Sequence, residues 1–306
     1  MTIKHPIESG NFLIPTPQIQ ELSQTIQWWL ENRITGAVIY GKPRIGKTSA
    51  MMLIGETLLK GVYNIPYFYM SAVQESKPSE SSFYSNLLQA VNHPKPNNQN
   101  KAQKRIQLLD YFLVIARDSQ QDRLVLMIDE AQNLTEYHYD WLISLYNELY
   151  FRDVQLITFL VGQEQLNLQK QTFLEMGMAQ IVGRFMVDSQ EFYGIRSKHE
   201  IKEVLKAFDS KIEFPEGSGV SYTNYFFKSG LHLSDYSDNL YMALKNINLE
   251  HSINPHSEIP LYSFIPIVRE ALLQCGDFGQ QLTAIEVTDW EDIIKSTMYI
   301  TWMRIA

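Results

Sequence analysis

The chain has 306 residues, of which 45% are hydrophobic and 20% charged, and its formal net charge is -8. This length exceeds one typical domain, so we expect a core of about 200 residues with a smaller second domain. A single cysteine, Cys275, excludes an internal disulfide framework and is better explained as a small buried residue than as a nucleophile. The first five residues do not open a signal peptide, and no apolar run approaches the ~18 residues of a membrane span. We therefore expect a cytoplasmic protein without a membrane partner.

The predicted elements begin with a helix that Thr16 caps and Pro17 opens. Strands are expected at residues 36–40, 65–70, 124–128, 154–161 and 185–192, with helices at 48–60, 82–91, 101–117 and around 141–149. Strands that alternate with helices predict an α/β fold with a mostly parallel sheet. From about Ser197 the strand signals fade, and helices over 201–208, 239–247 and 265–273 indicate a helical lid. The predicted domains are residues 1–195 and 196–306.

The turn after the first predicted strand has the pattern G-x-x-x-x-G-K-T, formed by Gly41, Lys42, Pro43, Arg44, Ile45, Gly46, Lys47 and Thr48. In such a loop several backbone amides point at phosphate oxygens, Lys47 reaches the β- and γ-phosphates, and the Thr48 hydroxyl holds Mg²⁺. The helix that follows adds the partial positive charge of its N-terminus. We expect residues 41–49, with Ser49 included, to bind a nucleoside triphosphate.

A second motif follows the continuous apolar run at residues 124–128, which predicts a central strand covered on both faces. The run ends in Asp129 and Glu130. An aspartate at the carboxyl end of such a strand suits a magnesium-water ligand, and Glu130 can orient and deprotonate the attacking water. The alternative reading of Glu130 is a solvated acid at a strand end. With the phosphate loop upstream, the pair predicts a nucleotide hydrolase and not only a nucleotide-binding module.

The charge is unevenly distributed along the chain. Residues 81–109 contain no acidic side chain but include Lys95, Lys101, Lys104 and Arg105, whereas acidic residues dominate after Leu231. A local basic surface on an acidic protein is compatible with contacts to nucleic-acid phosphates. A solvated loop and helix face explains the same stretch equally well.

These motifs, together with Phe159–Gln163 and Ile181–Phe185, come in the order and spacing of AAA+ ATPases. Within that superfamily the chain resembles the group that contains the transposition regulators TnsC and TniB and the secretion ATPase ExeA. The resemblance covers about residues 12–192, and residues 14–17 also resemble the start of TnsC and TniB proteins. It implies a P-loop core with a five-stranded parallel sheet, followed by a helical lid.

The resemblance also implies roles for individual residues. Ile14, Pro15 and Thr16 match the segment that flanks the adenine, and Gln163 matches the sensor 1 residue that contacts the γ-phosphate or the lytic water. Arg184 matches the arginine finger, which reaches the nucleotide of a neighbouring subunit in a ring or filament. The alternatives are an ordinary loop glutamine and a surface arginine. Residues 230–244 contain no arginine that matches sensor 2, which predicts slow hydrolysis or unusual lid coupling.

In TnsC-like regulators the segments after the second strand follow the phosphates of DNA. In this chain those segments would supply Lys77, Lys95, Lys101, Lys104 and Arg105. The resemblance therefore implies a homo-oligomer, a ring or helical filament, that assembles on double-stranded DNA with ATP bound and links a target-selection protein to a transposase. Two alternatives remain open, an ExeA-like or signalling ATPase that remodels protein partners without DNA and a helicase-loader-like ATPase of replication.

Overall fold

The structure, a computed structural model, describes residues 4–93, 100–228, 230–254, 257–276 and 283–305. The chain forms two compact units. The sheet unit comprises residues 22–42 and 47–192, and the helical unit comprises residues 1–21, 43–46 and 193–306. Among the described residues, no helix combines the length and the apolar character that crossing a membrane requires.

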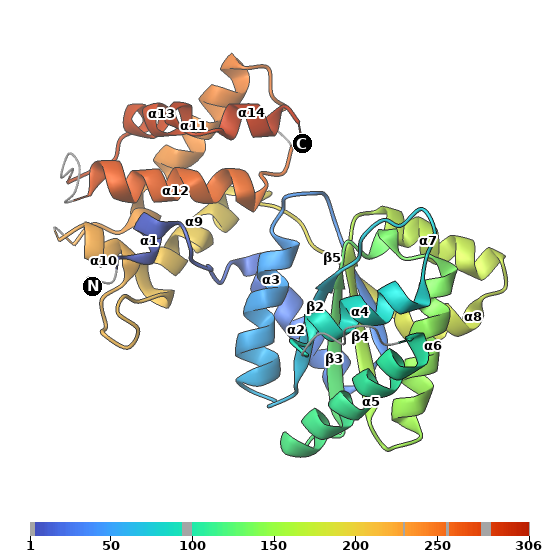
Figure 1. Cartoon of the computed structure of the whole chain (residues 1–306). Helices are drawn as coiled ribbons and strands as arrows, with labels where there is room; N and C mark the ends of the chain where they lie inside the picture. The colour runs from blue at the N-terminus through green and yellow to red at the C-terminus, as the bar shows by residue number, and fades with distance from the viewer. Residues whose placement is uncertain (1–3, 94–99, 229, 255–256, 277–282, 306) are drawn as a thin grey trace. The chain divides into compact units, whose positions relative to one another are not determined.

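The sheet unit is built on five parallel strands in the order β2-β3-β4-β1-β5 (Figure 1). The strands are β1 (Gly36–Tyr40), β2 (Tyr67–Ser71), β3 (Arg123–Asp129), β4 (Gln155–Gly162) and β5 (Asp188–Glu191). In β3 and β4 every residue after the first is buried, as the continuous apolar runs predict. β4 lies between β1 and β3, and all three strands run parallel. The residues that follow these strands therefore lie at the same end of the sheet, where the strands have their carboxyl ends. The predicted α/β fold is confirmed.

Helices of the sheet unit pack against the apolar side chains of this sheet. They are α2 (Pro17–Glu31), α3 (Lys47–Ile54) continued by the π-helix η1 (Gly55–Lys60), α4 (Glu80–Ala90), α5 (Lys101–Asp118), the 3-10 turn η2 (Ala131–Asn133), α6 (Glu136–Tyr150), α7 (Gln165–Glu175) and α8 (Ala179–Phe185). The helices α4, α5 and α6 share one hydrophobic cluster with β3 through Tyr84, Phe112 and Leu142. Side chains on one helix face and one sheet face thus close the core.

The strand predicted at residues 185–192 is wrong in its first part. Ile181, Val182, Phe185 and Met186 are buried at helical spacing, and the first three belong to α8. Only Asp188–Glu191 forms β5, a short polar strand that pairs with β1 at the edge of the sheet. The apolar residues looked like a buried strand, but their period is that of a helix.

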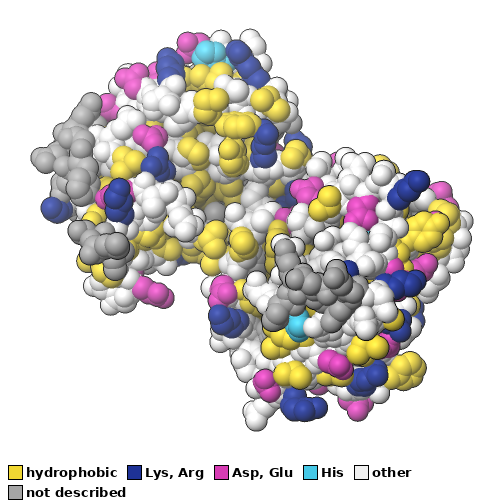
Figure 2. Space-filling view, in the orientation of Figure 1, with side chains coloured by type: hydrophobic (Ala, Val, Ile, Leu, Met, Phe, Trp, Pro, Cys, Tyr) yellow, Lys and Arg dark blue, Asp and Glu magenta, His cyan; other side chains and the backbone are white. Residues whose placement is uncertain are grey.

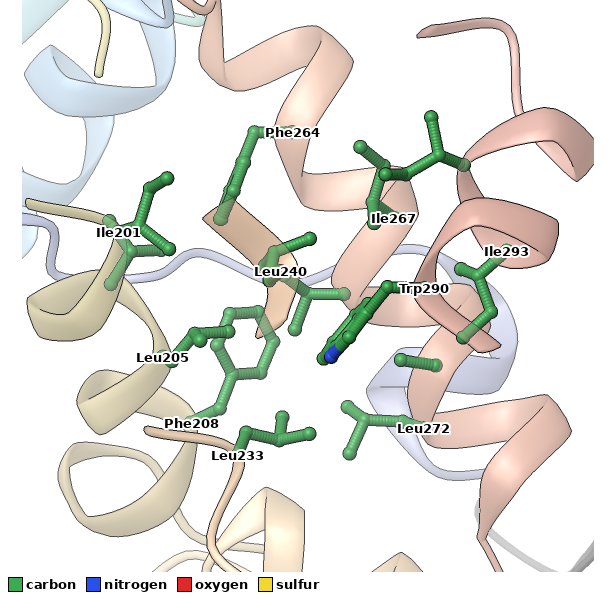
Figure 3. Packing of buried hydrophobic residues seen from close by; sticks show 14 of the residues in the cluster. Ile201, Leu205, Phe208, Leu233, Leu240, Phe264, Ile267, Leu272, Trp290 and Ile293 are labelled. Carbon is green, nitrogen blue, oxygen red and sulfur yellow. The ribbon is translucent and has the colours of Figure 1, made fainter. Parts of the chain in front are cut away.

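The helical unit surrounds a second hydrophobic cluster. Its elements are α1 (Pro6–Ser9), α9 (Lys198–Lys206) with the π-helix η3 (Ala207–Lys211), α10 (Tyr222–Phe226), the 3-10 turn η4 (Leu233–Tyr236), α11 (Ser237–Glu250), α12 (Leu261–Cys275), α13 (Val287–Ser296) and α14 (Tyr299–Met303). Figure 3 shows Trp290 from α13 facing Leu240 of α11 and Leu272 of α12. Cys275 is a free, buried cysteine of this unit.

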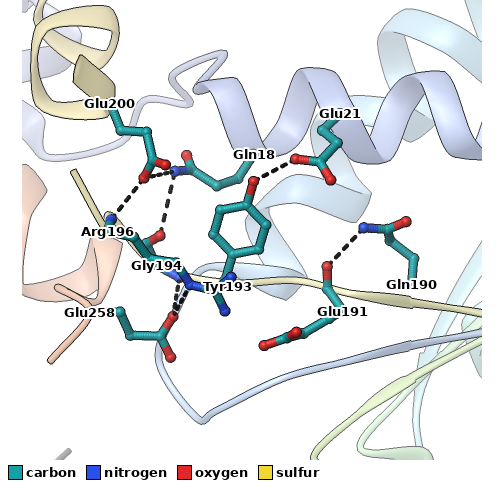
Figure 4. Close-up of polar contacts among 9 residues, drawn as sticks. All are labelled: Gln18, Glu21, Gln190, Glu191, Tyr193, Gly194, Arg196, Glu200 and Glu258. Atoms are coloured by element: carbon teal, nitrogen blue, oxygen red, sulfur yellow. Dashed lines mark hydrogen bonds and ion pairs between the residues drawn. The ribbon is translucent and has the colours of Figure 1, made fainter. Parts of the chain in front are cut away.

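The N-terminal segment groups with the helical unit, whereas the sequence-based division placed it with the sheet. Ile7 and Ile14 are buried in the helical unit's hydrophobic cluster. In the first turn of α2, the Gln18 amide donates to the Gly194 carbonyl (3.4 Å) and to the Glu200 carboxylate (3.1 Å), as Figure 4 shows. Apolar burial and these side-chain hydrogen bonds are long-range, so sequence periodicity could not reveal them.

Candidate functional site

The phosphate loop joins β1 to α3, and its lysine is the first residue of that helix. Lys47 is 8% exposed, and its Nζ donates to the carbonyl oxygens of Gly41 (2.9 Å) and Lys42 (2.6 Å). Burial lowers the pKa of Lys47, while the negative charges of Asp129 and Glu130 act to raise it. The ammonium group is therefore held at the N-terminus of α3 beside two carboxylates.

The aspartate at the end of β3 joins three elements of the sheet unit. The Thr48 hydroxyl donates to Asp129 Oδ2 at 2.6 Å, and the Glu130 backbone N–H donates to Asp129 Oδ1 at 2.8 Å. From the neighbouring strand β2, the Tyr69 hydroxyl also donates to Asp129 Oδ2. Burial, together with this hydrogen bond and the aspartate's charge, raises the pKa of Tyr69. The carboxylate is thus oriented by three donors.

The oxygens of Thr48 and Asp129 are hard ligands of the kind that Mg²⁺ prefers. Within the described part of the chain, no group of three or more His, Cys, Asp or Glu side chains could hold a metal ion by itself. A magnesium ion at Thr48 and Asp129 would therefore complete its shell with phosphate oxygens and water, which is its usual mode in nucleotide sites.

Glu130 is exposed and adopts a left-handed backbone conformation, with φ 51°. Its carboxylate accepts a hydrogen bond from Gln132 Nε2 at 2.5 Å, and Gln132 Oε1 accepts one from the Gln163 backbone N–H at 3.2 Å. Gly162 makes room for this link, because a Cβ there would lie 2.3 Å from Gln132 Oε1. The structure therefore connects Glu130 and Gln163 through one side chain.

Sequence reasoning did not single out Tyr69 or Gln132. The register pairs Ser71 with Asp129, so Tyr69 lies two residues before that position and on the same face of β2. Pairing of β2 with β3 had no sequence signal of its own. Gln132 lies in the stretch that follows Glu130, and only the 3-10 turn η2 directs its amide back to that carboxylate.

Comparison with known proteins adds an independent observation. Residues 34–169 match the model of an AAA domain. The chain has the AAA+ P-loop NTPase fold. No curated protein sequence matched the chain.

Solved structures of ORC proteins from Aeropyrum pernix share this fold. The ORC2 protein in its ADPNP–ADP complexes superposes with a TM-score of 0.58 at 12% identity, over 96% of this chain and 72% of that one. The ORC1 protein in complex with DNA gives a TM-score of 0.51 at 10% identity, over 94% of this chain and 64% of that one. At these identities the similarity concerns the fold.

Other predicted site residues lie elsewhere in the AAA+ fold. Arg184, on α8, is half-buried, donates to the Gln180 carbonyl (3.1 Å), and has its guanidinium 5.7 Å from the ring centre of Tyr146. Among the described residues, no hydrogen bond or ion pair joins Arg184 to Lys47 or Asp129. Ile14, Pro15 and Thr16 belong to the helical unit, as do residues 43–46 of the phosphate loop.

The basic residues that we expected to contact DNA are mostly engaged within the sheet unit. Lys101 pairs with Glu80 (2.7 Å), Arg105 pairs with Glu148 (3.3 Å), and Lys104 donates to the hydroxyls of Ser81 (2.9 Å) and Ser85 (2.8 Å). Lys77 is exposed, and Lys95 lies outside the described residues. Figure 2 shows acidic and basic side chains interspersed on the visible face. A stretch without acids in sequence is therefore not a surface without acids.

Proposed function

We propose that this chain is an AAA+ ATP hydrolase. The observation that carries the proposal is the hydrogen bond of 2.6 Å between Thr48 and Asp129, which joins the phosphate loop to the second motif beside Lys47 and Glu130. Residues 41–49 hold the triphosphate, with Lys47 at the β- and γ-phosphates. Thr48 and Asp129 hold Mg²⁺, which offsets phosphate charge when bound.

In the reaction we assign to this site, a water attacks the γ-phosphorus and the bond to the β-phosphate oxygen breaks, giving ADP and phosphate. Glu130 orients the water and accepts its proton. Gln163 contacts the γ-phosphate or that water. Since Gln132 bonds both Glu130 and the Gln163 backbone, it sets their spacing.

Two substitutions test this chemistry. Lys47→Ala should abolish ATP binding, because it removes a charge that contacts the bound phosphates. Glu130→Gln should preserve binding but reduce turnover by about 10²–10⁴-fold, the usual contribution of a general base. Binding is measured with a fluorescent ATP analogue and turnover by phosphate release. Equal turnover in the wild type and Glu130→Gln would refute the assignment.

We also propose that Arg184 acts on the nucleotide of a neighbouring subunit. An arginine finger that acts on a neighbouring subunit lies away from the nucleotide site of its own subunit. In the part of the chain that the structure describes, Arg184 contacts the Gln180 carbonyl and the Tyr146 ring and makes no hydrogen bond or ion pair with Lys47 or Asp129, which supports this location. Arg184→Ala should lose ATPase activity and ATP-dependent oligomers while each monomer still binds nucleotide. Normal oligomers of Arg184→Ala in the presence of ATP would remove this role.

The finer function that we propose is a regulator of DNA transposition. In this role the ATP-bound chain assembles as a cytoplasmic ring or filament on double-stranded DNA and links a target-selection protein to a transposase. The sequence resemblance to TnsC-like proteins supports this function, and the solved ORC1 structure that shares the fold contains DNA. The shared ORC fold also makes a helicase-loader-like role in replication the second candidate.

Imaging the protein with a non-hydrolysable ATP analogue, with and without a duplex of arbitrary sequence, tests the DNA step. We expect ATP-dependent oligomers on DNA whose affinity falls steeply with salt. Co-purification with a transposase or with a replicative helicase then separates the two candidates. If no ATP-dependent DNA binding occurs even at low salt, the ExeA-like role of remodelling protein partners replaces both.

A further inference from the structure

The middle of the phosphate loop, Pro43–Gly46, belongs to the helical unit, and one side chain of that unit covers it. The guanidinium carbon of Arg44 lies 4.1 Å from the centre of the Trp302 ring, in α14. The Tyr262 ring packs edge-on against Trp302, with 5.0 Å between ring centres. Arg44 therefore rests on the Trp302 ring of α14, and Tyr262 of α12 packs edge-on against the same ring.

The loop backbone is held by the same helices. The Tyr262 N–H donates to the Arg44 carbonyl at 3.4 Å. Two residues along, Gly46 packs so closely on α12 that a Cβ would lie 3.2 Å from Leu261 Cδ1. Arg44 has φ 63°, a left-handed conformation that a non-glycine residue rarely adopts, whereas Gly46 has φ 103°, which glycine adopts without strain. A ring contact and a hydrogen bond thus hold Arg44, and a packing contact holds Gly46.

We propose that Trp302 is a positioning residue for the phosphate loop, which makes nucleotide affinity depend on the C-terminal end of the chain. This inference rests on the proposed function, because residues 41–49 must be the ones that bind ATP. Several amides of the loop have to point at one anion, and a loop that samples other conformations spends part of its binding free energy on becoming ordered. Trp302 reduces that cost by holding Arg44 before the nucleotide arrives.

The central measurement is the dissociation constant of a fluorescent, non-hydrolysable ATP analogue. Trp302→Leu should weaken binding about three- to thirtyfold, the range that a cation–π contact of this kind supplies. The matched control is Trp28→Leu, which removes an exposed tryptophan (52% exposed) from α2 and should leave affinity unchanged. A Trp302→Leu protein that binds the analogue as tightly as the wild type would overturn the proposal.

Limited trypsin digestion without nucleotide tests, independently of ATP binding, whether the contact of Trp302 with Arg44 holds the phosphate loop; we call this contact the clamp. Cleavage after Arg44 reports release of the loop, whereas cleavage after the exposed Lys60 reports the integrity of the sheet unit. In Trp302→Leu we expect faster cleavage after Arg44 and an unchanged rate after Lys60. An unchanged rate after Arg44 counts against the inference. If cleavage accelerates as expected but wild-type protein binds no nucleotide, the clamp stands and the proposed function fails.

A double-mutant cycle separates this contact from a general loss of packing. In an Arg44→Met background, Trp302→Leu should no longer change the dissociation constant, because the guanidinium that it held is gone. Trp302→Tyr keeps an aromatic face and should retain most of the wild-type affinity. This variant also provides the test if Trp302→Leu folds poorly. Additive effects of Arg44→Met and Trp302→Leu, or a Trp302→Tyr protein as weak as Trp302→Leu, would contradict the positioning role.

Discussion

The sheet unit and the helical unit bury their apolar side chains in different ways. In the sheet unit, β3 and β4 are continuous buried segments that pair with their neighbours in register. In the helical unit, short helices assemble one hydrophobic cluster, and it includes N-terminal residues. The Arg269 side chain, for example, donates to the Ile7 carbonyl at 2.8 Å across 262 positions of sequence. The elements of the first unit can be located from their local pattern, whereas the grouping of residues in the second depends on long-range contacts.

The two units also differ in whether the indole N–H of a buried tryptophan has a hydrogen-bond partner. Trp29 in the sheet unit is fully buried, and its Nε1–H donates to Asp188 Oδ2 at 2.8 Å. Trp290 in the helical unit is equally buried, but its Nε1 has no hydrogen-bond partner among the described residues. An unsatisfied buried donor costs free energy, so the indole contributes less net stability in the helical unit.

The largest effect that we expect is the difference between these two sites. Trp29→Phe should lower the free energy of unfolding by about 3–4 kcal/mol, since it removes a bond to a carboxylate and leaves a cavity. Trp290→Phe should cost only about 1–2 kcal/mol, because loss of the unsatisfied N–H offsets part of the cavity term. Denaturant titration of both proteins gives the comparison. Equal costs would show that the indole N–H of Trp290 is satisfied in solution.

The N-terminal anchor of the helical unit gives a pH-dependent effect. His5 is 1% exposed among aromatic rings, its Nδ1 accepts the Ile7 N–H (3.1 Å), and burial lowers its pKa from 6.5 to about 4. The rings that surround it belong to Phe214, Tyr222, Tyr225 and Phe226. Above pH 6.5 the folded and unfolded states both hold neutral histidine, and this contribution to stability is complete. As the pH falls towards 4, only the unfolded state gains the proton.

Stability should therefore fall by about 2 kcal/mol from this group between pH 7 and pH 5, and the rest is lost as the pH falls through about 4. The measurement is the free energy of unfolding across this range, compared with that of His5→Phe. The stability that the wild type loses through His5 at low pH, relative to His5→Phe, should shrink steadily as the pH rises to 6.5. Above that pH the difference in unfolding free energy between the two proteins should stay constant. Parallel pH profiles would show that His5 titrates normally and that the N-terminal segment is not anchored as described.

Much of the sheet unit could be predicted from sequence because its signals are local. The strand at residues 36–40 was placed at its observed bounds, the phosphate loop follows it, and Asp129 lies at the carboxyl end of β3 as expected. The grouping of residues 1–21 and 43–46 with the helical unit depends on contacts with distant residues such as Glu200 and Trp302. The strand predicted at residues 185–192 was longer than the short polar strand β5, because the buried end of the helix before it is also apolar. Side-chain partners such as Tyr69 required the register between strands.

Removing the hydrogen bond from Tyr69 tests how far the function of Asp129 in the sheet unit depends on such side-chain partners. Tyr69→Phe removes one donor from Asp129, so the carboxylate should be less well oriented for the Mg²⁺ that we propose it holds with Thr48. We expect the Mg²⁺ concentration for half-maximal ATPase activity to rise about tenfold, near the lower end for lost outer-shell partners. Tyr67→Phe is the matched control on the same strand, since the Tyr67 hydroxyl donates to Glu56 instead. The same Mg²⁺ dependence in both variants would leave Tyr69 with a packing role only.

The smallest effects should come from the surface cations, and they rank by their partners. Lys77 is exposed and has no ion pair among the described residues, whereas Lys101 is neutralised by Glu80 at 2.7 Å. If the ATP-bound protein binds DNA, Lys77→Ala should lower the slope of log affinity against log salt by about 1, as expected for one lost phosphate contact. Lys101→Ala should lower it by much less, and Glu80→Gln should raise it by freeing Lys101. Equal decreases for Lys77→Ala and Lys101→Ala would mean that the Lys101–Glu80 pair opens when DNA binds, because only an unpaired lysine can release a counterion from the duplex.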